Sequence, residues 1–314
     1  MNILRLLILF PILLLLTACD TAFLGNVPQN PSPVVNATNI TEAEPVNITT
    51  NETPIDVVPE TPLYIPSQNN LIVYVMDVKG QSILVMQDEN SLLIDSGTEE
   101  DSANILKNLR NLGIEKLDNL IISNTMEGSI GGLPYIIIQT SPANVYDSGN
   151  PSQSSSYVLY NELIKETPTI NKVLVSTDKL LTLGSAFIRI FVVYDDGSGF
   201  LPDSQDNSIV SRITYQSNSI LAMSNCGFQC LEKLKNEDLK SDVLIIDGSC
   251  DSTTLTFIQK VNPKAVVSTN EVCKETEDRF KFLNIPLYYT LKHGDIKITA
   301  DGTNFELKYL KIAG

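Results

Sequence analysis

The chain changes in character near residue 66, and this change sets what each part can fold into. Residues 20–66 hold eight of the 16 prolines and six acidic residues but no lysine or arginine. Their apolar residues show no sustained helical or alternating period, so this segment cannot bury enough surface to offset its chain entropy. Residues 67–314 contain repeated apolar runs, and their 248 residues fit one large domain.

The first residues have the pattern of an export signal. Arg5 precedes an apolar stretch, 6–16, that Pro11 interrupts and that is shorter than the roughly 20 residues a membrane-spanning helix needs. Residues 16–19 (LTAC) resemble the lipobox of prokaryotic lipoproteins, in which cleavage before the cysteine leaves a lipid-bearing N-terminus. The resemblance implies a signal peptide at 1–18 and a lipid anchor at Cys19 on the extracytoplasmic side of the cell membrane. An uncleaved anchor helix, or a signal peptide with a chance cysteine, is the alternative.

The segment 19–66 is predicted to be a disordered acidic tether, which prolines and like charges keep extended. The Asn-x-Ser/Thr sequons of the chain all fall in it, at Asn36, Asn39, Asn47 and Asn51. Their confinement to an exposed linker predicts a glycosylated stalk, although a segment rich in Asn and Thr also produces sequons by chance. The lipobox and the sequons together indicate an archaeal cell surface.

The charge balance disfavours nucleic acid as a partner. The chain has 37 acidic and 22 basic residues, a formal net charge of −15, and residues 67–314 alone carry 31 acidic and 21 basic residues. A phosphate backbone is bound by Lys- and Arg-rich surfaces, which release counterions. The acidity is therefore interpreted as a means of keeping an extracellular domain soluble.

Local patterns in residues 67–314 predict many strands and fewer helices. Runs rich in Ile, Val, Leu and Tyr, bounded by Gly, Asn, Asp and Ser, predict strands at 71–77, 82–87, 91–95, 119–123, 172–176, 187–193, 208–215, 219–223, 242–246, 264–268, 295–299 and 305–310. Helical periodicity and caps predict helices at 102–112, 155–166, 229–239, 253–261 and 275–283. The early strands follow one another, whereas later strands alternate with helices. This order predicts two sheets packed together with helices outside, or one mixed α/β sheet.

The order of short motifs resembles the metallo-β-lactamase fold, and in particular the extracellular hydrolase-like domain of the DNA-uptake protein ComEC and its free-standing relatives. The motifs that carry the resemblance, all quoted from this chain, are DVKGQS (77–82), LLIDSG (92–97), LDNLIIS (117–123), NTMEGSIGGL (124–133), DNSIV (206–210), ILAMSN (220–225), VLIIDGS (243–249), KAVVS (264–268) and TLKHGDI (290–296). The resemblance implies an α/β (α+β) domain at 67–314, an αββα sandwich of two mixed β-sheets flanked by helices.

The family's metal ligands are missing from this frame. Active members carry His-x-His-x-Asp-His after the strand that ends here at Ser123, a bridging Asp in a later loop, and a His pair after a further strand. In this chain those positions are Asn124, Met126, Gly128, Ser129, Asn225, Ile246 and Asp247. Catalytic zinc needs about three nitrogen, oxygen or sulfur ligands from the protein, which Met, Gly and Ile do not supply. With only one histidine in the chain, His293, we expect no metal and no other cofactor.

Other groups are candidates for chemistry in the same cleft. The carboxylates Asp77, Asp95 and Glu127, together with Asp147 and Asp247, are oxygen donors that suit Ca²⁺ or Mg²⁺, but a solvated or turn-capping role is the simpler interpretation. His293 lies in a predicted turn before a strand and is interpreted as a surface turn residue. A Ser-His-Asp triad is disfavoured, because no Gly-x-Ser-x-Gly motif is present.

The remaining cysteines, Cys226, Cys230, Cys250 and Cys273, lie in the predicted extracytoplasmic part. Four cysteines allow three pairings, and spacing alone does not select one. The resemblance implies that they gather where the family's ligand loops lie. Two disulfides are preferred to a Cys₄ zinc site, because the compartment is oxidising, and to a redox pair, because no Cys-x-x-Cys is present.

These observations predict a surface-anchored lipoprotein whose catalytically inactive domain binds or scaffolds something in the cell envelope. Its expected partners are the membrane, through the lipid, and an unidentified envelope protein or small ligand. The alternative is a divergent phosphodiesterase- or nuclease-like hydrolase that uses carboxylates, cysteines or His293. A third interpretation, a pure spacer or assembly subunit, is favoured if side chains or disulfides fill the cleft.

Overall fold

A computed structural model describes residues 69–193, 204–248, 250 and 253–310. The chain divides into two units between Val57 and Val58, and the described residues all belong to the second unit. The predicted signal peptide, Cys19, the tether and the four sequons lie outside the described residues. In the described part of the chain, no helix is both long and apolar enough to cross a membrane.

The first sheet has eight strands and is partly antiparallel, partly parallel. Strands β1, β2 and β3 form an antiparallel meander, and β3 to β6 run parallel, joined by helical connections. In spatial order its strands are β15 (Phe305–Leu310), β14 (Asp295–Ala300), β1 (Leu71–Val75), β2 (Ile83–Gln87), β3 (Asn90–Ile94), β4 (Asn119–Ile122), β5 (Asn144–Asp147) and β6 (Asn171–Leu174).

The second sheet has seven strands with a similar division. Strands β7 to β10 are antiparallel neighbours, and β10 to β13 are parallel. In spatial order its strands are β13 (Leu287–Tyr289), β12 (Ala265–Ser268), β11 (Val243–Ile246), β10 (Asn218–Ala222), β9 (Val210–Tyr215), β8 (Ala186–Phe191) and β7 (Lys179–Leu183).

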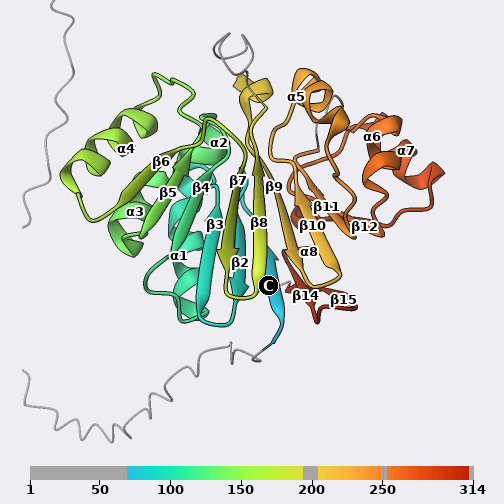
Figure 1. The fold of residues 1–314 in the computed structure, drawn as a ribbon, viewed down its shortest axis with the longest axis horizontal. Helices are drawn as coiled ribbons and strands as arrows, with labels where there is room; N and C mark the ends of the chain where they lie inside the picture. Colours follow the sequence, from blue (N-terminus) through green and yellow to red (C-terminus); the bar gives the residue numbers. More distant parts are fainter. Residues whose placement is uncertain (1–68, 194–203, 249, 251–252, 311–314) are drawn as a thin grey trace, which may run out of the picture. The chain divides into compact units, whose positions relative to one another are not determined.

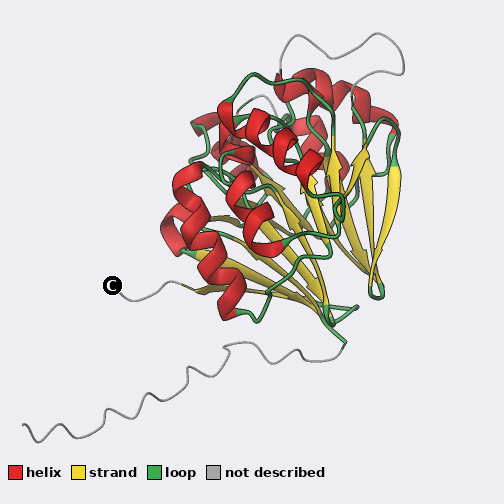
Figure 2. Cartoon of the chain, turned by 90° about the vertical axis from the view of Figure 1, so that its left-hand side faces the viewer, coloured by secondary structure: helices red, strands yellow, loops and turns green. Residues whose placement is uncertain are grey.

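The two sheets pack face to face, with helices on both outer faces (Figures 1 and 2). The helices are α1 (Ser102–Asn111), α2 (Glu127–Ile130), α3 (Leu133–Thr140), α4 (Ser155–Glu166), α5 (Phe228–Lys233), α6 (Leu255–Val261), α7 (Lys274–Phe282) and α8 (Thr290–His293). One hydrophobic cluster lies between the two sheets. A second lies between the first sheet and its helices, and a third between the second sheet and its helices. The predicted fold class, an αββα sandwich of two mixed sheets flanked by helices, is confirmed.

Strand β1 shows why the apolar runs of this sequence are continuous. Its five residues are all buried, because Leu71, Val73 and Val75 enter the cluster between the sheets while Ile72 and Tyr74 enter the cluster beneath the helices. A strand that is covered on both faces needs apolar side chains at every position. Because both faces of the sheet are covered, the uncovered parts are the ends of the strands and the loops that follow them. These lie at the two open edges of the sandwich.

The predicted strands are all present, with ends that differ by at most two residues. Three further strands, β5, β7 and β13, and three helices, α2, α3 and α8, were not predicted. Helix α3 contains the run Ile136-Ile137-Ile138, which by itself favours a strand. The helix predicted at 229–239 is wrong in extent: α5 ends at Lys233 and a 3-10 turn (Leu234–Asn236) follows.

Candidate functional site

The positions where the resemblance expects metal ligands follow strands of both sheets at one edge of the sandwich. Strand β4 leads to Asn124 and Met126, and β10 leads to Asn225. The two groups meet, because the Asn225 side-chain nitrogen lies 3.5 Å from the Met126 sulfur. The structure therefore brings the positions predicted from distant motifs to one place.

The side chains at these positions are engaged with the protein. Asn124 is fully buried, accepts a hydrogen bond from the backbone N–H of Met126 at 2.9 Å and donates one to Ser123 Oγ at 3.1 Å. The Gly128 carbonyl accepts from the N–H of Gln81 at 2.8 Å. Ser129 is buried, and its carbonyl accepts from Ser96. These contacts tie α2 to the loops before β2 and after β3.

The last two positions separate. Ile246 is fully buried in the cluster beneath α5, α6 and α7, so its side chain lies on the outer face of the second sheet. Asp247, the next residue, is partly exposed at the end of β11. The side chain of Ile246 therefore offers no metal ligand.

A buried polar cluster lies at the same edge, formed by Gln81, Asp95, Ser123 and Ser224, which we call the strand-end cluster. Asp95 accepts hydrogen bonds from Ser123 N at 2.8 Å, Ser123 Oγ at 2.6 Å and Gln81 Nε2 at 3.0 Å. Gln81 Nε2 also lies 3.1 Å from Ser224 Oγ, which joins the first sheet to the second. Sequence analysis identified Asp95 but not the other three members of the cluster, which come from three separate segments.

Burial dominates the electrostatics of Asp95. The residue is 1% exposed, and desolvation raises the pKa of its carboxyl to about 7, against the opposing effect of the hydrogen bonds from Ser123 and Gln81. Asp95 and Ser224 also have left-handed backbone conformations, with φ of 61° and 51°. Such strain persists only where surrounding contacts impose it, which the cluster's hydrogen bonds do here.

The other predicted carboxylates do not join this cluster. The backbone N–H of Asp77 donates to Asp295, and Glu127 is exposed and accepts from Ser156 Oγ at 3.0 Å. Asp147 is fully buried, but it pairs with Lys172 Nζ at 3.0 Å on β6. The structure thus distributes these carboxylates among separate contacts.

Asp101, which sequence analysis did not identify, closes the loop over this edge. Its carboxylate accepts from the backbone N–H groups of Lys79, Gly80 and Thr98 at 3.0, 3.2 and 2.8 Å. The loop is thereby pressed against α2, and a Cβ on Gly80 would lie 2.0 Å from the Gly128 carbonyl oxygen. Only glycine fits at this close approach.

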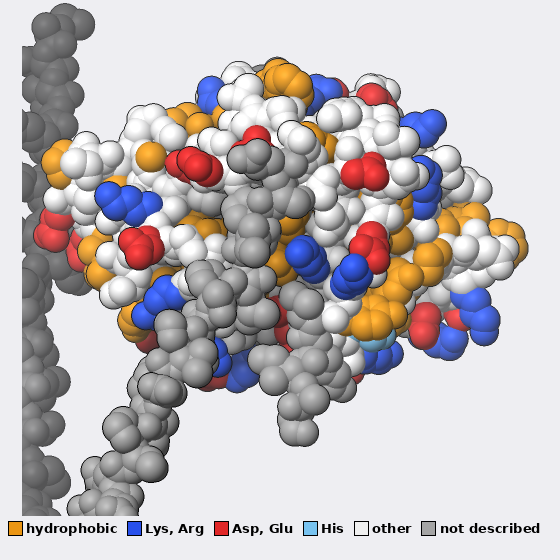
Figure 3. All heavy atoms as spheres, turned by 90° about the horizontal axis from the view of Figure 1, so that it is seen from below, with side chains coloured by type: hydrophobic (Ala, Val, Ile, Leu, Met, Phe, Trp, Pro, Cys, Tyr) orange, Lys and Arg blue, Asp and Glu red, His pale blue; other side chains and the backbone are white. Residues whose placement is uncertain are grey.

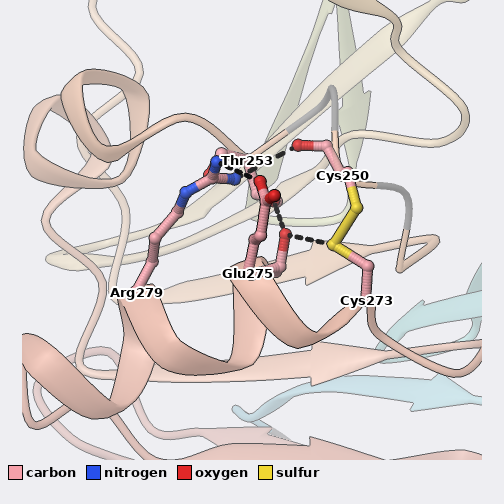
Figure 4. The surroundings of a disulfide bond; sticks show 6 residues. Cys250, Thr253, Cys273, Glu275 and Arg279 are labelled. Carbon is pink, nitrogen blue, oxygen red and sulfur yellow. Dashed lines mark hydrogen bonds and ion pairs between the residues drawn. A yellow bond between two sulfur atoms is a disulfide. The ribbon is translucent and has the colours of Figure 1, made fainter.

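The disulfide prediction is confirmed, and the structure selects one of the three pairings. Cys226 pairs with Cys230 across 5.4 Å between Cα atoms, and Cys250 pairs with Cys273 across 5.7 Å. The first pair is fully buried and joins α5, which contains Cys230, to the loop before it, whereas the second is partly exposed at the start of α7. Figure 4 shows the second pair, where Arg279 donates to the carbonyls of Cys250 and Thr253. The four cysteines are therefore not a shared zinc site.

The prediction that His293 is a surface turn residue is wrong. It is the last residue of α8 and is partly buried, with its ring stacked on Tyr309 at 4.8 Å between centroids. Its Nδ1 lies 2.8 Å from the Tyr289 carbonyl oxygen and 3.1 Å from the Tyr289 nitrogen. A packing role explains these contacts.

The residues at this edge do not fit the zinc ions that the resemblance implies. The donors at these positions are amides, a hydroxyl, a thioether and a single carboxylate, that of Asp247, and the amide oxygen of Asn124 is occupied by the Met126 N–H. Zinc sites use thiolates, imidazoles and carboxylates. Among the residues that the structure describes, no group of three or more His, Cys, Asp or Glu is placed to hold a metal ion.

Comparison with known proteins gives likenesses of structure only: neither a protein-family model nor a curated protein matches the chain. The metallo-β-lactamase fold protein YhfI from Bacillus subtilis is 14% identical over 70% of this chain and 95% of that chain, with a TM-score of 0.49. Tm1679, a metal-dependent hydrolase of the β-lactamase superfamily, is 16% identical over 69% and 94%, with a TM-score of 0.47. A diphosphatase from the PhnP family is 15% identical over 73% and 86%, with a TM-score of 0.43.

Proposed function

We propose that this protein is a surface-anchored lipoprotein whose αββα domain is catalytically inactive and acts as a binding or scaffold module of the cell envelope. The observation that carries the proposal is the donor set at the edge where the resemblance expects two zinc ions. There, Asn124 and Asn225 are amides, Met126 is a thioether, and Ile246 lies on the outer face of its sheet. Two-metal hydrolysis needs a different set of ligands.

The internal contacts of this edge support the same proposal. The amide of Asn124, the carbonyls of Gly128 and Ser129, and the carboxylate of Asp95 all bond to other groups of the domain. A site that binds substrate needs polar groups that are directed at the substrate. Here those groups stabilise the packing of α2 and the two sheets, and the disulfides add to that rigidity.

The test of inactivity is metal analysis and hydrolysis by the full chain purified in detergent. We expect zinc and manganese well below one ion per chain and no turnover of a generic phosphodiester such as bis-p-nitrophenyl phosphate. Stoichiometric metal together with turnover would establish the alternative, a divergent hydrolase. Replacing Asp95 by Asn in an active sample would then show whether the buried carboxyl takes part.

The anchoring part of the proposal rests on residues 1–66 and has its own test. The lipobox-like LTAC places the lipid on Cys19, and the acidic tether carries the sequons. Cys19→Ala is expected to abolish the incorporation of labelled lipid and to move the protein from the detergent phase to the aqueous phase. A matched Cys250→Ala variant should remain in the detergent phase. Retention of the Cys19→Ala protein in the membrane would instead indicate an uncleaved anchor helix.

A further inference from the structure

A pocket lies at the opposite ends of the strands from the site described above. Three segments that precede the parallel strands β10, β11 and β12 form it, together with one side chain from β9, and its volume is about 450 Å³. Small-molecule sites fall in the range of about 300–1,000 Å³. The lining residues are Arg212, Ser217, Ser219, Lys240, Ser241, Asp242, Asn262, Pro263 and Lys264. We call this the basic pocket.

The base of the basic pocket is held by a network around Asp242. Its carboxylate accepts from the Ser219 N–H at 2.9 Å and pairs with Lys264 Nζ at 2.8 Å. Burial raises the pKa of Asp242, but the bonds from Lys264 and Ser219 outweigh this effect and hold the pKa below its ordinary value. The charge of Asp242 is therefore already compensated by Lys264.

Two cations of the lining are only partly engaged by the protein. Arg212 directs Nε and Nη2 at the Lys240 carbonyl oxygen, at 3.1 and 2.7 Å, which orients its guanidinium. Its Nη1 has a 3.7 Å contact with Asp238, a carboxylate whose side chain is 73% exposed. Lys240 forms no ion pair with any residue that the structure describes. An oriented guanidinium and an unpaired ammonium are the groups that recognise oxyanions.

The remaining lining groups are polar and uncharged. The hydroxyls of Ser217 and Ser241 donate to backbone carbonyls, so their oxygens remain available as acceptors. Figure 3 views this end of the strands, where basic side chains gather beside acidic ones to the right of centre. The concentration of cations contrasts with the net acidity of the domain, in which 31 acidic residues outnumber 21 basic ones.

We propose that the basic pocket binds a small polar molecule through an oxyanion, a phosphate or a carboxylate. Lys240 Nζ and Arg212 Nη1 supply the charge, and the serine hydroxyls and Asn262 contact the uncharged part of the ligand. The volume suits a molecule of the size of a sugar phosphate or a sugar acid. This site is separate from the strand-end cluster, so it stands whether or not the other edge has activity.

The test is calorimetric titration of the full chain in detergent at low ionic strength, because salt screens such contacts. The probes are inorganic phosphate, glucose 6-phosphate, glucuronate and, as the uncharged comparison, glucose. We expect at least one charged probe to bind and glucose not to bind, and the comparison of glucose 6-phosphate with glucuronate separates the two oxyanions. Hydrogen exchange should then slow in the segments 217–219, 240–242 and 262–264.

The variants are chosen to leave the fold intact. Lys240→Gln removes an ammonium that has no ion pair, and Lys274→Gln removes an equal charge from α7, outside the pocket lining. We expect Lys240→Gln to weaken binding about tenfold or more, and Lys274→Gln to change it less than about twofold. The absence of binding by every charged probe, equal weakening by both variants, or slowed exchange only outside the three segments would overturn the proposal.

Discussion

The two ends of the sandwich differ in how their polar groups are used. At the carboxyl ends of the parallel strands, Asp95, Asn124 and Gln81 bond to one another's segments and are buried. At the amino ends of β10, β11 and β12, an open pocket is lined by Lys240, which has no ion pair with a described residue, and by Arg212, whose Nη1 contacts only the exposed Asp238 at 3.7 Å. Ligands of α/β sheets usually bind at the carboxyl ends. In this protein most polar groups at that end bond within the domain, with the buried Gln81 Oε1 as an exception, whereas the cations available for a ligand lie at the other end.

The largest expected effect tests how tightly the closed end is packed. A Cβ at Gly80 would lie 2.0 Å from the Gly128 carbonyl oxygen, whereas a Cβ at Gly128 would meet the Gly80 Cα at 3.5 Å, an ordinary contact. Gly80→Ala should therefore lower the free energy of unfolding by more than about 4 kcal/mol, because backbone on backbone cannot yield cheaply. Gly128→Ala, in a helical turn, should be neutral or stabilising by up to about 1 kcal/mol.

Urea unfolding of both variants, followed by circular dichroism, measures this asymmetry. Equal and small losses for the two alanines would show that the loop containing Gly80 moves away from α2. The carboxyl end would then be a loose surface, and the contrast with the basic pocket would fail.

The second prediction separates the two disulfides. Cys250 and Cys273 are partly exposed, and Cys273 caps the N-terminus of α7, which stabilises a thiolate. A small thiol should bond to the Cys250 sulfur and release Cys273 as the thiolate, whereas Cys226 and Cys230 are fully buried and protected. Removing both cysteines of the 23-residue loop, in Cys250→Ala/Cys273→Ala, should cost about 3 kcal/mol.

Brief exposure to dithiothreitol under native conditions, alkylation and peptide mass analysis identify the reduced pair. Labelling is expected at Cys250 and Cys273 first. Faster labelling at Cys226 and Cys230 would mean that α5 opens more readily than α7, contrary to their burial.

The third prediction concerns Asp95 and pH. Burial raises the pKa of its carboxyl from 3.8 to about 7, so between these values the folded state holds a proton that the unfolded state releases. The stability that Asp95 contributes is therefore complete below pH 4 and is lost as the pH rises through 7. In Asp95→Asn this pH dependence should disappear. Between about pH 4 and 7, the difference in the free energy of unfolding between the variant and the unmodified chain should therefore change by up to about 1.4 kcal/mol per pH unit.

Asp301 is the matched control with the opposite sign. It is exposed, and hydrogen bonds from the N–H groups of Asn304 and Thr303 lower the pKa of its carboxyl. Its contribution is present above its unfolded pKa and lost as the pH falls. Thermal unfolding of both asparagine variants from pH 2 to 8 should therefore give slopes of opposite sign, for Asp301→Asn below about pH 4 and for Asp95→Asn between about pH 4 and 7. Parallel slopes would mean that Asp95 is hydrated and that the closed end admits water.

The layered fold was predictable because covered strands leave a continuous apolar pattern, as in β1. The prediction that certain positions correspond to the family's metal ligands comes only from the resemblance, and the structure brings two of them, Met126 and Asn225, into contact. The other members of the strand-end cluster were not predictable, since Gln81, Ser123 and Ser224 lie in separate segments that only the packing of two sheets brings together. The pairing of the four cysteines was not predictable for the same reason, because their separation along the sequence does not determine how far apart they lie in the folded protein.

The basic pocket was missed for a related reason. Its lining comes from three loops and one strand, and no two of its cations are adjacent in the sequence. Sequence analysis treated the charge of the domain as a sum, whereas the pocket depends on where a few cations are left without acidic neighbours. A balance of −10 over residues 67–314 therefore gave no sign of a local cationic site.

The smallest expected effect tests whether Lys240 contributes to the stability of the fold. The comparison of the two ends requires that it does not. Lys240→Gln should change the free energy of unfolding by less than about 0.5 kcal/mol, because no described carboxylate pairs with it. Lys264→Gln removes the partner of Asp242, whose side chain is only 15% exposed, and should cost about 1 kcal/mol. Urea unfolding at low salt resolves the two. An equal loss in the free energy of unfolding for Lys240→Gln and Lys264→Gln would show that both lysines stabilise the fold. The polar groups at the amino ends of the strands would then be engaged within the domain, like those at the carboxyl ends.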